Sequence, residues 1–256
     1  MAGRADTKLD REITKSDQPE PLFIIIPCFD EEKTIYRLLE KCRDVDVTPL
    51  GLRKKIILVD DGSADGSPQE IERFRNDNPD THLCLLTLQN NRGKGYAIRH
   101  ALEMCEGGIV IIQDADFEYY PEQFPLVLEP VVRGMSDVAY GSRWINPGAM
   151  SVSGALYFLG GWLENRYLHL LYRTNISDIA TCYKAFRTDL IKTLDLECTG
   201  FEFCPEVTAK LLNRGVKIIE TPIKYKARKK HEGKKIGWLD FVVAIYTLTR
   251  LRFRRK

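Results

Sequence analysis

Two apolar runs that end in aspartate residues are the clearest pattern along this chain. The runs at 56–59 and 109–112 consist of isoleucine, leucine and valine. Each is followed by a pair of aspartates, which are Asp60 and Asp61 in the first case and Asp114 and Asp116 in the second. Short runs rich in β-branched residues predict buried strands. Because ligands bind beyond the carboxyl ends of parallel strands, we expect both pairs to face one cleft.

Strand and helix patterns alternate along the first 141 residues. The predicted strands are 22–27, 55–60, 83–89, 109–113 and 137–141, and the predicted helices begin after Asp30 and span 68–77, 95–106 and 122–133. Later segments predict helices at 152–172 and 203–213, strands at 182–186 and 216–222, a basic loop and a final helix. This order predicts an α/β fold that is Rossmann-like, with a mostly parallel sheet and helices on both faces, followed by further C-terminal helices.

One domain accounts for the length of 256 residues. Residues 1–20 are polar and charged without an apolar stretch, which predicts a disordered leader and not a signal peptide. The predicted α/β domain spans 21–225, and 226–256 form a basic loop and an amphipathic helix of the same domain. No uninterrupted apolar stretch reaches about 18 residues, so no transmembrane helix is expected.

Charge and cysteine content exclude several classes of protein. The net charge of +2 gives no support for a nucleic-acid partner, although basic residues are concentrated after residue 225. The seven cysteines form no Cys-x-x-Cys pair, and no histidine lies at a zinc-ligand spacing from them. We therefore expect reduced thiols in a cytosolic compartment and no structural zinc.

The sequence Asp114-Ala115-Asp116 is the strongest candidate for a metal site. Alternate carboxylates at the end of a strand can turn toward one Mg²⁺ or Mn²⁺ ion, which also binds water and diphosphate oxygens. The acidic segment 61–72 has the oxygen spacing of a calcium-binding EF-hand loop, but it follows a strand pattern and contains Pro68, which argues against that motif. Lys94 lies between two glycines at the start of a predicted helix, where it could balance a diphosphate.

Together these motifs resemble the family 2 glycosyltransferases of GT-A fold, over roughly residues 21–240. The segment 26–32, Ile-Pro-Cys-Phe-Asp-Glu-Glu, is similar to the first strand and nucleotide-binding loop of that family. The resemblance implies a donor that is a GDP- or UDP-linked sugar. The nucleotide-sugar-binding residues that it implies are Pro27, Phe29, Glu31, Asp60, Asp61, Lys94, Asp114 and Ala115.

Later motifs resemble the branch of the family that is similar to dolichol-phosphate mannose synthase. These motifs are Gly141-Ser142-Arg143, the segments 178–187 and 201–206, Arg228, and Gly233-Lys234-Lys235-Ile236. The resemblance implies inverting transfer of a hexose to a polyprenyl or dolichyl phosphate. It implies catalytic roles for Asp114, Asp116 and Arg143, and a Mg²⁺ or Mn²⁺ ion bound by Asp114, Asp116 and Glu118. Mannosyl enzymes of this branch often have Gln where this chain has Glu118, so the sugar stays open.

A phosphate acceptor determines which other side chains the site needs. The second pKa of a phosphate is about 6, so the attacking oxygen is largely ionised at neutral pH and needs no general base. Basic groups must instead hold a second anion beside the donor diphosphate. The candidates for binding the acceptor phosphate are Arg143, Lys184, Arg187, Arg228, Lys234 and Lys235.

Two apolar segments suggest association with a membrane. Residues 152–172 carry leucines and aromatic residues, interrupted by Glu164, Asn165 and Arg166, and 238–256 have a similar composition with a basic end. Helices of this kind can lie flat on a lipid surface, which predicts a peripheral protein on the cytoplasmic face. The alternative is that they pack internally or between subunits, so a homo-oligomer or a membrane-anchored partner remains open.

Two further hypotheses about function remain. Transfer to a sugar or protein hydroxyl would need a carboxylate base, for which Asp178 and Glu202 are candidates. The chain could instead be a non-catalytic subunit that binds a nucleotide sugar and recruits a membrane partner.

Overall fold

The computed structural model describes residues 18–145, 150–151, 155–228, 235 and 237–254. It contains a seven-stranded sheet with the strand order β3-β2-β1-β4-β7-β5-β8. The strands are β1 (Glu20–Cys28), β2 (Leu52–Asp60), β3 (Leu83–Thr87), β4 (Ile109–Ile112), β5 (Val138–Ser142), β6 (Met150–Ser151), β7 (Lys184–Arg187), β8 (Ile219–Pro222) and β9 (Tyr225–Lys226). The helices are α1 (Ile35–Asp44), α2 (Ser67–Asp77), α3 (Lys94–Glu103), α4 (Phe124–Val132), α5 (Ala155–Tyr172), α6 (Thr188–Lys192), α7 (Phe203–Asn213) and α8 (Trp238–Phe253). The predicted α/β architecture is confirmed.

Strand direction explains which side chains meet. Strand β1 pairs in parallel with β2 and β4, so that Cys28 lies opposite Asp60 and Ile25 opposite Ile112. The carboxyl ends of these strands therefore lie at one edge of the sheet. Strand β7 is antiparallel to both of its neighbours, β4 and β5, and its last residue, Arg187, lies opposite Ile109 at the amino end of β4. The small sheet formed by β6 and β9, and the short helix α6, were not predicted.

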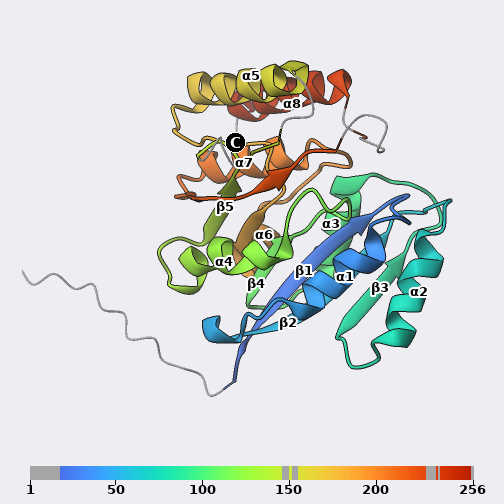
Figure 1. Cartoon of the computed structure of the whole chain (residues 1–256). Coiled ribbons are helices and arrows are strands. Elements are labelled where there is room, and N and C mark those ends of the chain that lie inside the picture. The colour runs from blue at the N-terminus through green and yellow to red at the C-terminus, as the bar shows by residue number, and fades with distance from the viewer. Residues whose placement is uncertain (1–17, 146–149, 152–154, 229–234, 236, 255–256) are drawn as a thin grey trace, which may run out of the picture.

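Alternate residues of β1 point into two cores. Ile24 and Ile26 pack in the core that includes residues of α1, α2 and α4, whereas Ile25 packs in the core that includes residues of α3, α7 and α8. These helices cover the two faces of the sheet (Figure 1). Burial on both faces is the reason why residues 22–26 of β1 and 56–59 of β2 are continuous apolar runs and do not alternate with polar residues.

Helices α5 and α8 lie side by side next to α7, at the top of the view in Figure 1. The Tyr172 hydroxyl donates to the Leu248 carbonyl at 2.9 Å, and the Tyr167 and Thr249 hydroxyls are 2.7 Å apart. Helix α8 thus packs against the rest of the chain. In the part of the chain that the structure describes, no helix is long and apolar enough to cross a bilayer.

Candidate active site

The two aspartate pairs lie at the same edge of the sheet, where β2 and β4 end. The main chain of Asp61 donates to the Cys28 carbonyl at 2.8 Å, and that of Gln113 donates to the Ile25 carbonyl at 2.9 Å. Both acidic segments therefore leave the sheet beside the end of β1, as expected from the sequence.

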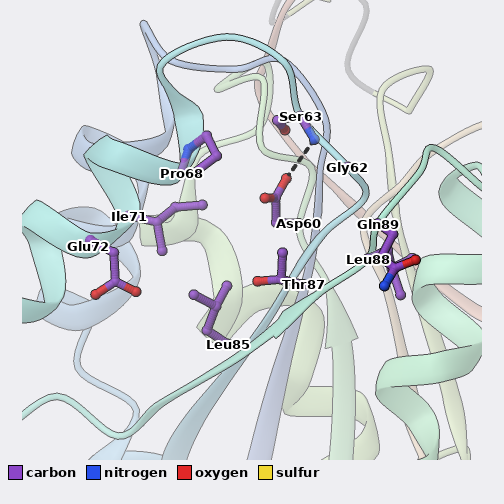
Figure 2. A pocket seen from close by; sticks show the side chains of 10 residues that line it. All are labelled: Asp60, Gly62, Ser63, Pro68, Ile71, Glu72, Leu85, Thr87, Leu88 and Gln89. Atoms are coloured by element: carbon purple, nitrogen blue, oxygen red, sulfur yellow. Dashed lines mark hydrogen bonds between the residues drawn. The ribbon is translucent and has the colours of Figure 1, made fainter.

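Asp60 and Asp61 have different surroundings. The carboxylate of Asp60 accepts from the main chain of Ser63 at 3.1 Å. It faces a cavity of about 250 Å³ between α2 and β3, and Gly62 also lines this cavity (Figure 2). The carboxylate of Asp61 accepts from the main chains of Arg92 and Gly93, each at 2.8 Å. Asp61 therefore holds the glycine-rich turn that precedes Lys94.

Lys94 connects this turn to the Asp-x-Asp motif. Gly93 has φ +92°, and a Cβ atom at this position would lie only 2.4 Å from the Thr199 carbonyl oxygen, so the turn requires glycine. The Lys94 ammonium forms an ion pair with Asp114 and lies 2.9 Å from the Cys182 sulfur. Burial lowers the pKa of Lys94, but the charge and hydrogen bond of Asp114, together with the charges of Cys182 and Cys204, outweigh this effect and raise the pKa, so the lysine stays cationic.

Arg228 and Lys235 bring positive charge to the other carboxylates. The Arg228 guanidinium donates to Glu31 at 2.8 and 3.1 Å and to Asp116 at 3.2 Å. The Lys235 ammonium lies 2.7 Å from Glu31. Burial, together with the charges of Asp114 and Glu118, raises the pKa of Asp116 to about 7. A divalent cation would relieve this repulsion.

Glu118 has both carboxylate oxygens engaged. One accepts from the Tyr225 hydroxyl, and the other accepts from the main chain of Arg228 at 2.7 Å. The side chain is buried and thus anchors the segment 225–228 beside the Asp-x-Asp motif. This contact spans more than 100 residues of sequence, so no local signal predicts it.

The carboxylate oxygens of Asp114 and Asp116 are suited to Mg²⁺ or Mn²⁺ as two ligands of a larger shell. Among the described residues, no group of three or more His, Cys, Asp or Glu side chains is placed to hold a metal ion. Asp114 and Asp116 nevertheless supply the hard oxygens that these ions prefer, and Mg²⁺ commonly takes one or two carboxylates and completes its shell with water and substrate phosphates. Glu118 as a third ligand would first have to release its present hydrogen bonds.

The remaining nucleotide-site candidates surround the same edge. Phe29 follows β1, and the Lys235 ammonium lies 5.5 Å from its ring centre. The Ala115 carbonyl accepts from the Thr34 hydroxyl at 2.8 Å, which holds the Asp-x-Asp loop against the loop after β1. Pro27 is partly buried in β1, opposite Val59.

The predicted acceptor-site cations are not all in one place. Arg143 pairs with the fully buried Asp178 through two side-chain hydrogen bonds of 2.7 Å, and its guanidinium carbon lies 4.9 Å from the Tyr225 ring centre. Lys184 is fully buried and donates to the Ile179 carbonyl at 2.8 Å.

Arg187 pairs with Glu20 at the opposite end of the sheet from the Asp-x-Asp motif. The structure therefore brings Arg228 and Lys235 to the carboxylates, places Lys184 in the core, and places Arg187 far from the site. The reason is the antiparallel direction of β7, which carries Arg187 away from the carboxyl ends of its neighbours. Lys234 lies outside the described residues.

Known proteins resemble the chain over most of its length. The undecaprenyl-phosphate mannosyltransferase of Micrococcus luteus is 28% identical over 83% of this chain and 86% of its own. The dolichol-phosphate mannosyltransferase of Pyrococcus furiosus is 24% identical over 89% of this chain, which spans 63% of that protein. The resemblance to polyprenyl-phosphate glycosyltransferases is confirmed.

A solved structure shows the same fold. It is glucosyl-3-phosphoglycerate synthase from Mycobacterium tuberculosis, in complex with Mn²⁺, UDP and glucosyl-3-phosphoglycerate. The TM-score is 0.66 at 14% identity, over 91% of this chain and 78% of that one. This similarity confirms the predicted GT-A fold.

The family model for "Glycosyl transferase family 2" matches residues 23–195, which include the Asp-x-Asp motif, Lys94 and Arg143. The match covers more than half of the chain and favours an enzyme over a non-catalytic binding subunit. The chain therefore belongs to glycosyl transferase family 2 and is a glycosyltransferase.

Proposed function

We propose that this enzyme transfers a hexose, with inversion, from a GDP- or UDP-linked sugar to a polyprenyl phosphate at the cytoplasmic surface of a membrane, using Mg²⁺ or Mn²⁺. The observation that carries the proposal is the meeting of two sets of charges at one sheet edge. Asp114 and Asp116 offer oxygens for a metal diphosphate, Arg228 pairs with Asp116, and Lys235 pairs with Glu31, which also binds Arg228. The names of the two relatives support the choice of acceptor.

The donor would bind across the ends of β1, β2 and β4. The turn that starts at Asp60 lines the cavity in Figure 2, where the base and ribose would be held, and Phe29 follows Cys28, which lies opposite Asp60. Asp114 and Asp116 would hold the metal, which acts as a Lewis acid on the leaving diphosphate. Lys94, already paired with Asp114, adds a fixed positive charge next to the same phosphates.

The acceptor phosphate would bind to the cations that lie between the Asp-x-Asp motif and the loop after β1. Arg228 can present two N–H groups to a phosphate, and Lys235 adds a point charge. Glu31 holds both side chains in place at 2.7–3.1 Å. The sequence predicts a catalytic, phosphate-binding role for Arg143, but we propose a positioning role instead, because its guanidinium is paired with Asp178 and lies against the Tyr225 ring.

The reaction needs a single displacement. An oxygen of the acceptor phosphate attacks the anomeric carbon, the bond to the donor diphosphate breaks, and the nucleoside diphosphate leaves with the electron pair. Because the attacking oxygen is already ionised, catalysis consists of positioning and charge stabilisation. A hydroxyl acceptor would need a base, and the engagement of Asp178 by Arg143 supports the phosphate instead.

Exposed apolar side chains on α5 and α8 support a membrane surface as partner. The most exposed are Leu170 at 80%, Trp238 at 73% and Phe253 at 72%. Arg252 and Arg254, near the end of α8, are also exposed and could contact anionic headgroups. Aromatic and leucine side chains flanked by arginine are typical of helices that lie in the interface of a bilayer.

The main test is the release of nucleoside diphosphate from a panel of GDP- and UDP-linked sugars, with Mg²⁺ or Mn²⁺, with and without a short polyprenyl phosphate in detergent. Release that requires the lipid phosphate and yields a lipid-linked monosaccharide is expected. Release that does not require it would point to a hydroxyl acceptor or to hydrolysis. Full turnover by Asp116→Asn at saturating metal would contradict the metal site.

Membrane association has a separate test. Flotation with vesicles that contain anionic lipid is expected to recover wild-type protein, and to recover much less of a Leu170→Gln/Trp238→Ser variant. Met135 is 57% exposed but lies on the connection between α4 and β5, so Met135→Gln is the matched control and should float like wild type. Equal recovery of all three proteins would argue against this surface.

A further inference from the structure

Two thiols, those of Cys182 and Cys204, lie near the Lys94–Asp114 ion pair. Cys182 precedes β7 and Cys204 is in the first turn of α7, and each is only 7% exposed. The two thiols are close enough to interact, because their interaction raises the pKa of Cys182 and lowers that of Cys204. The Cys204 sulfur also lies 3.4 Å from the Thr181 carbonyl oxygen. Two cysteines that are 22 residues apart in sequence are thus adjacent in space.

Lys94 connects the thiol pair to the proposed site. Its ammonium lies 2.9 Å from the Cys182 sulfur and pairs with Asp114. The side chains of Lys94 and Asp114 are 12% and 15% exposed. A small molecule that reaches the exposed part of Asp114 is therefore separated from the Cys182 sulfur by one side chain, that of Lys94.

The charges around Cys204 favour its thiolate. The interaction with Cys182 and the ammonium groups of Lys184 and Lys94 lower the pKa of Cys204, although burial opposes them. The start of α7 also favours a negative sulfur, because main-chain N–H groups at a helix N-terminus stabilise anions. By contrast, burial raises the pKa of Cys28, Cys42, Cys105 and Cys198. The thiolate is the reactive form of cysteine, so Cys204 differs in kind from these four.

The geometry points to Cys182 and Cys204 as a site of reversible oxidation by peroxides, which forms a disulfide beside the donor-binding lysine. The Cys204 thiolate attacks one peroxide oxygen, the O–O bond breaks, and the leaving oxygen takes a proton to become water or an alcohol. The Cys182 sulfur then attacks the Cys204 sulfur, and the S–O bond breaks with loss of water. Two thiols are oxidised, one peroxide is reduced, and no other reactant is needed.

Disulfide formation would alter the site through Lys94. The Cys182 thiol would no longer accept from the Lys94 ammonium, and the segment before β7 would be tied to the start of α7. We expect at least a tenfold loss of transfer activity that dithiothreitol restores. This loss rests on the proposed function, whereas the disulfide itself does not.

The decisive experiment uses the full chain, treated with a small excess of hydrogen peroxide. Remaining thiols are alkylated, and the protein is digested without reduction for mass spectrometry. A cross-link between the peptides that contain Cys182 and Cys204, which disappears after dithiothreitol, is the expected result. Absence of this cross-link while both thiols remain free to alkylate would overturn the proposal, whatever the enzyme proves to transfer.

Variants connect the cross-link to activity. Cys204→Ser should form no cross-link and keep its activity after the same peroxide dose. Cys84 is partly exposed on β3, away from the pair, so Cys84→Ser should behave like wild type. Equal inactivation of Cys204→Ser and wild type would refute the link between the thiol pair and activity.

Discussion

Replacing Asp178 by asparagine tests the difference between a structural and a catalytic carboxylate. Asp178 is fully buried and accepts hydrogen bonds from Nε and Nη2 of Arg143, each at 2.7 Å, and from the Arg143 main chain at 2.9 Å. Removing one partner of a buried, hydrogen-bonded ion pair costs about 3–5 kcal/mol, since the other charge is left without compensation. We therefore expect Asp178→Asn to lower the free energy of unfolding by that amount.

The assay is urea denaturation followed by tryptophan fluorescence, combined with a double-mutant cycle. Arg143→Gln should also destabilise, and the double variant should lose less than the sum of the single variants by about 2 kcal/mol, because each change removes the same interaction. Asp80 is exposed, so Asp80→Asn is the control and should change the free energy of unfolding by less than about 0.5 kcal/mol.

Activity completes this test. If Asp178 only positions Arg143, the pH profile of residual transfer should keep its shape in Asp178→Asn. An unchanged free energy of unfolding, together with loss of the base-limited part of the pH profile, would refute the reasoning and identify Asp178 as a general base for a hydroxyl acceptor.

Three other predictions concern single side chains. Arg228→Gln should lower the Mn²⁺ concentration for half-maximal activity about tenfold, because Arg228 no longer competes with the metal for Asp116. The same variant should raise the KM for the lipid phosphate, and steady-state kinetics measures both effects. Burial raises the pKa of Glu164 from 4.5 to about 7, so between these pH values the folded protein binds a proton that the unfolded chain has lost. The free energy of unfolding should therefore fall by at most about 3 kcal/mol as the pH rises from 4.5 to above 7. Urea titrations should show no such slope in Glu164→Gln. Gly93→Ala should lower the thermal midpoint clearly, since its Cβ would clash with the main chain of residue 199 at 2.4 Å.

Matched controls separate these effects from general damage. Arg133 is 65% exposed and, among the described residues, forms an ion pair only with Glu129, so Arg133→Gln should leave metal dependence unchanged. Glu106→Gln removes an exposed carboxyl and should keep the wild-type pH slope. Gly134 also has a positive φ, +64°, but open space around it, so Gly134→Ala measures backbone strain without the clash. A similar effect of test and control variants would contradict the corresponding prediction.

The sequence predicts the donor side of the site better than the acceptor side. Asp60 and Asp114 could be placed together because parallel strands end at one sheet edge, and this needs only the strand pattern. The position of Lys184 depends on the direction and register of β7, which a four-residue run does not specify. The role of Glu118 depends on Tyr225, 107 residues away, and such a contact has no signature in local spacing. Apolar periodicity thus predicts the framework, while long-range polar contacts appear only in the fold.

The charges of the described cluster indicate an order of binding. Asp114 and Asp116 are paired with Lys94 and Arg228 respectively, so each carboxylate that would bind the metal already has a cationic partner. A divalent ion that arrives alone meets these cations, whereas one that arrives with a donor diphosphate adds nearly no net charge and gives the two cations new anionic partners. Release of Arg228 from Asp116 would leave a guanidinium that Glu31 still orients and that could face a second anion. On the proposed function, the charge balance would therefore favour binding of metal and donor together before the acceptor phosphate, and the release of Arg228 from Asp116 would couple the two events.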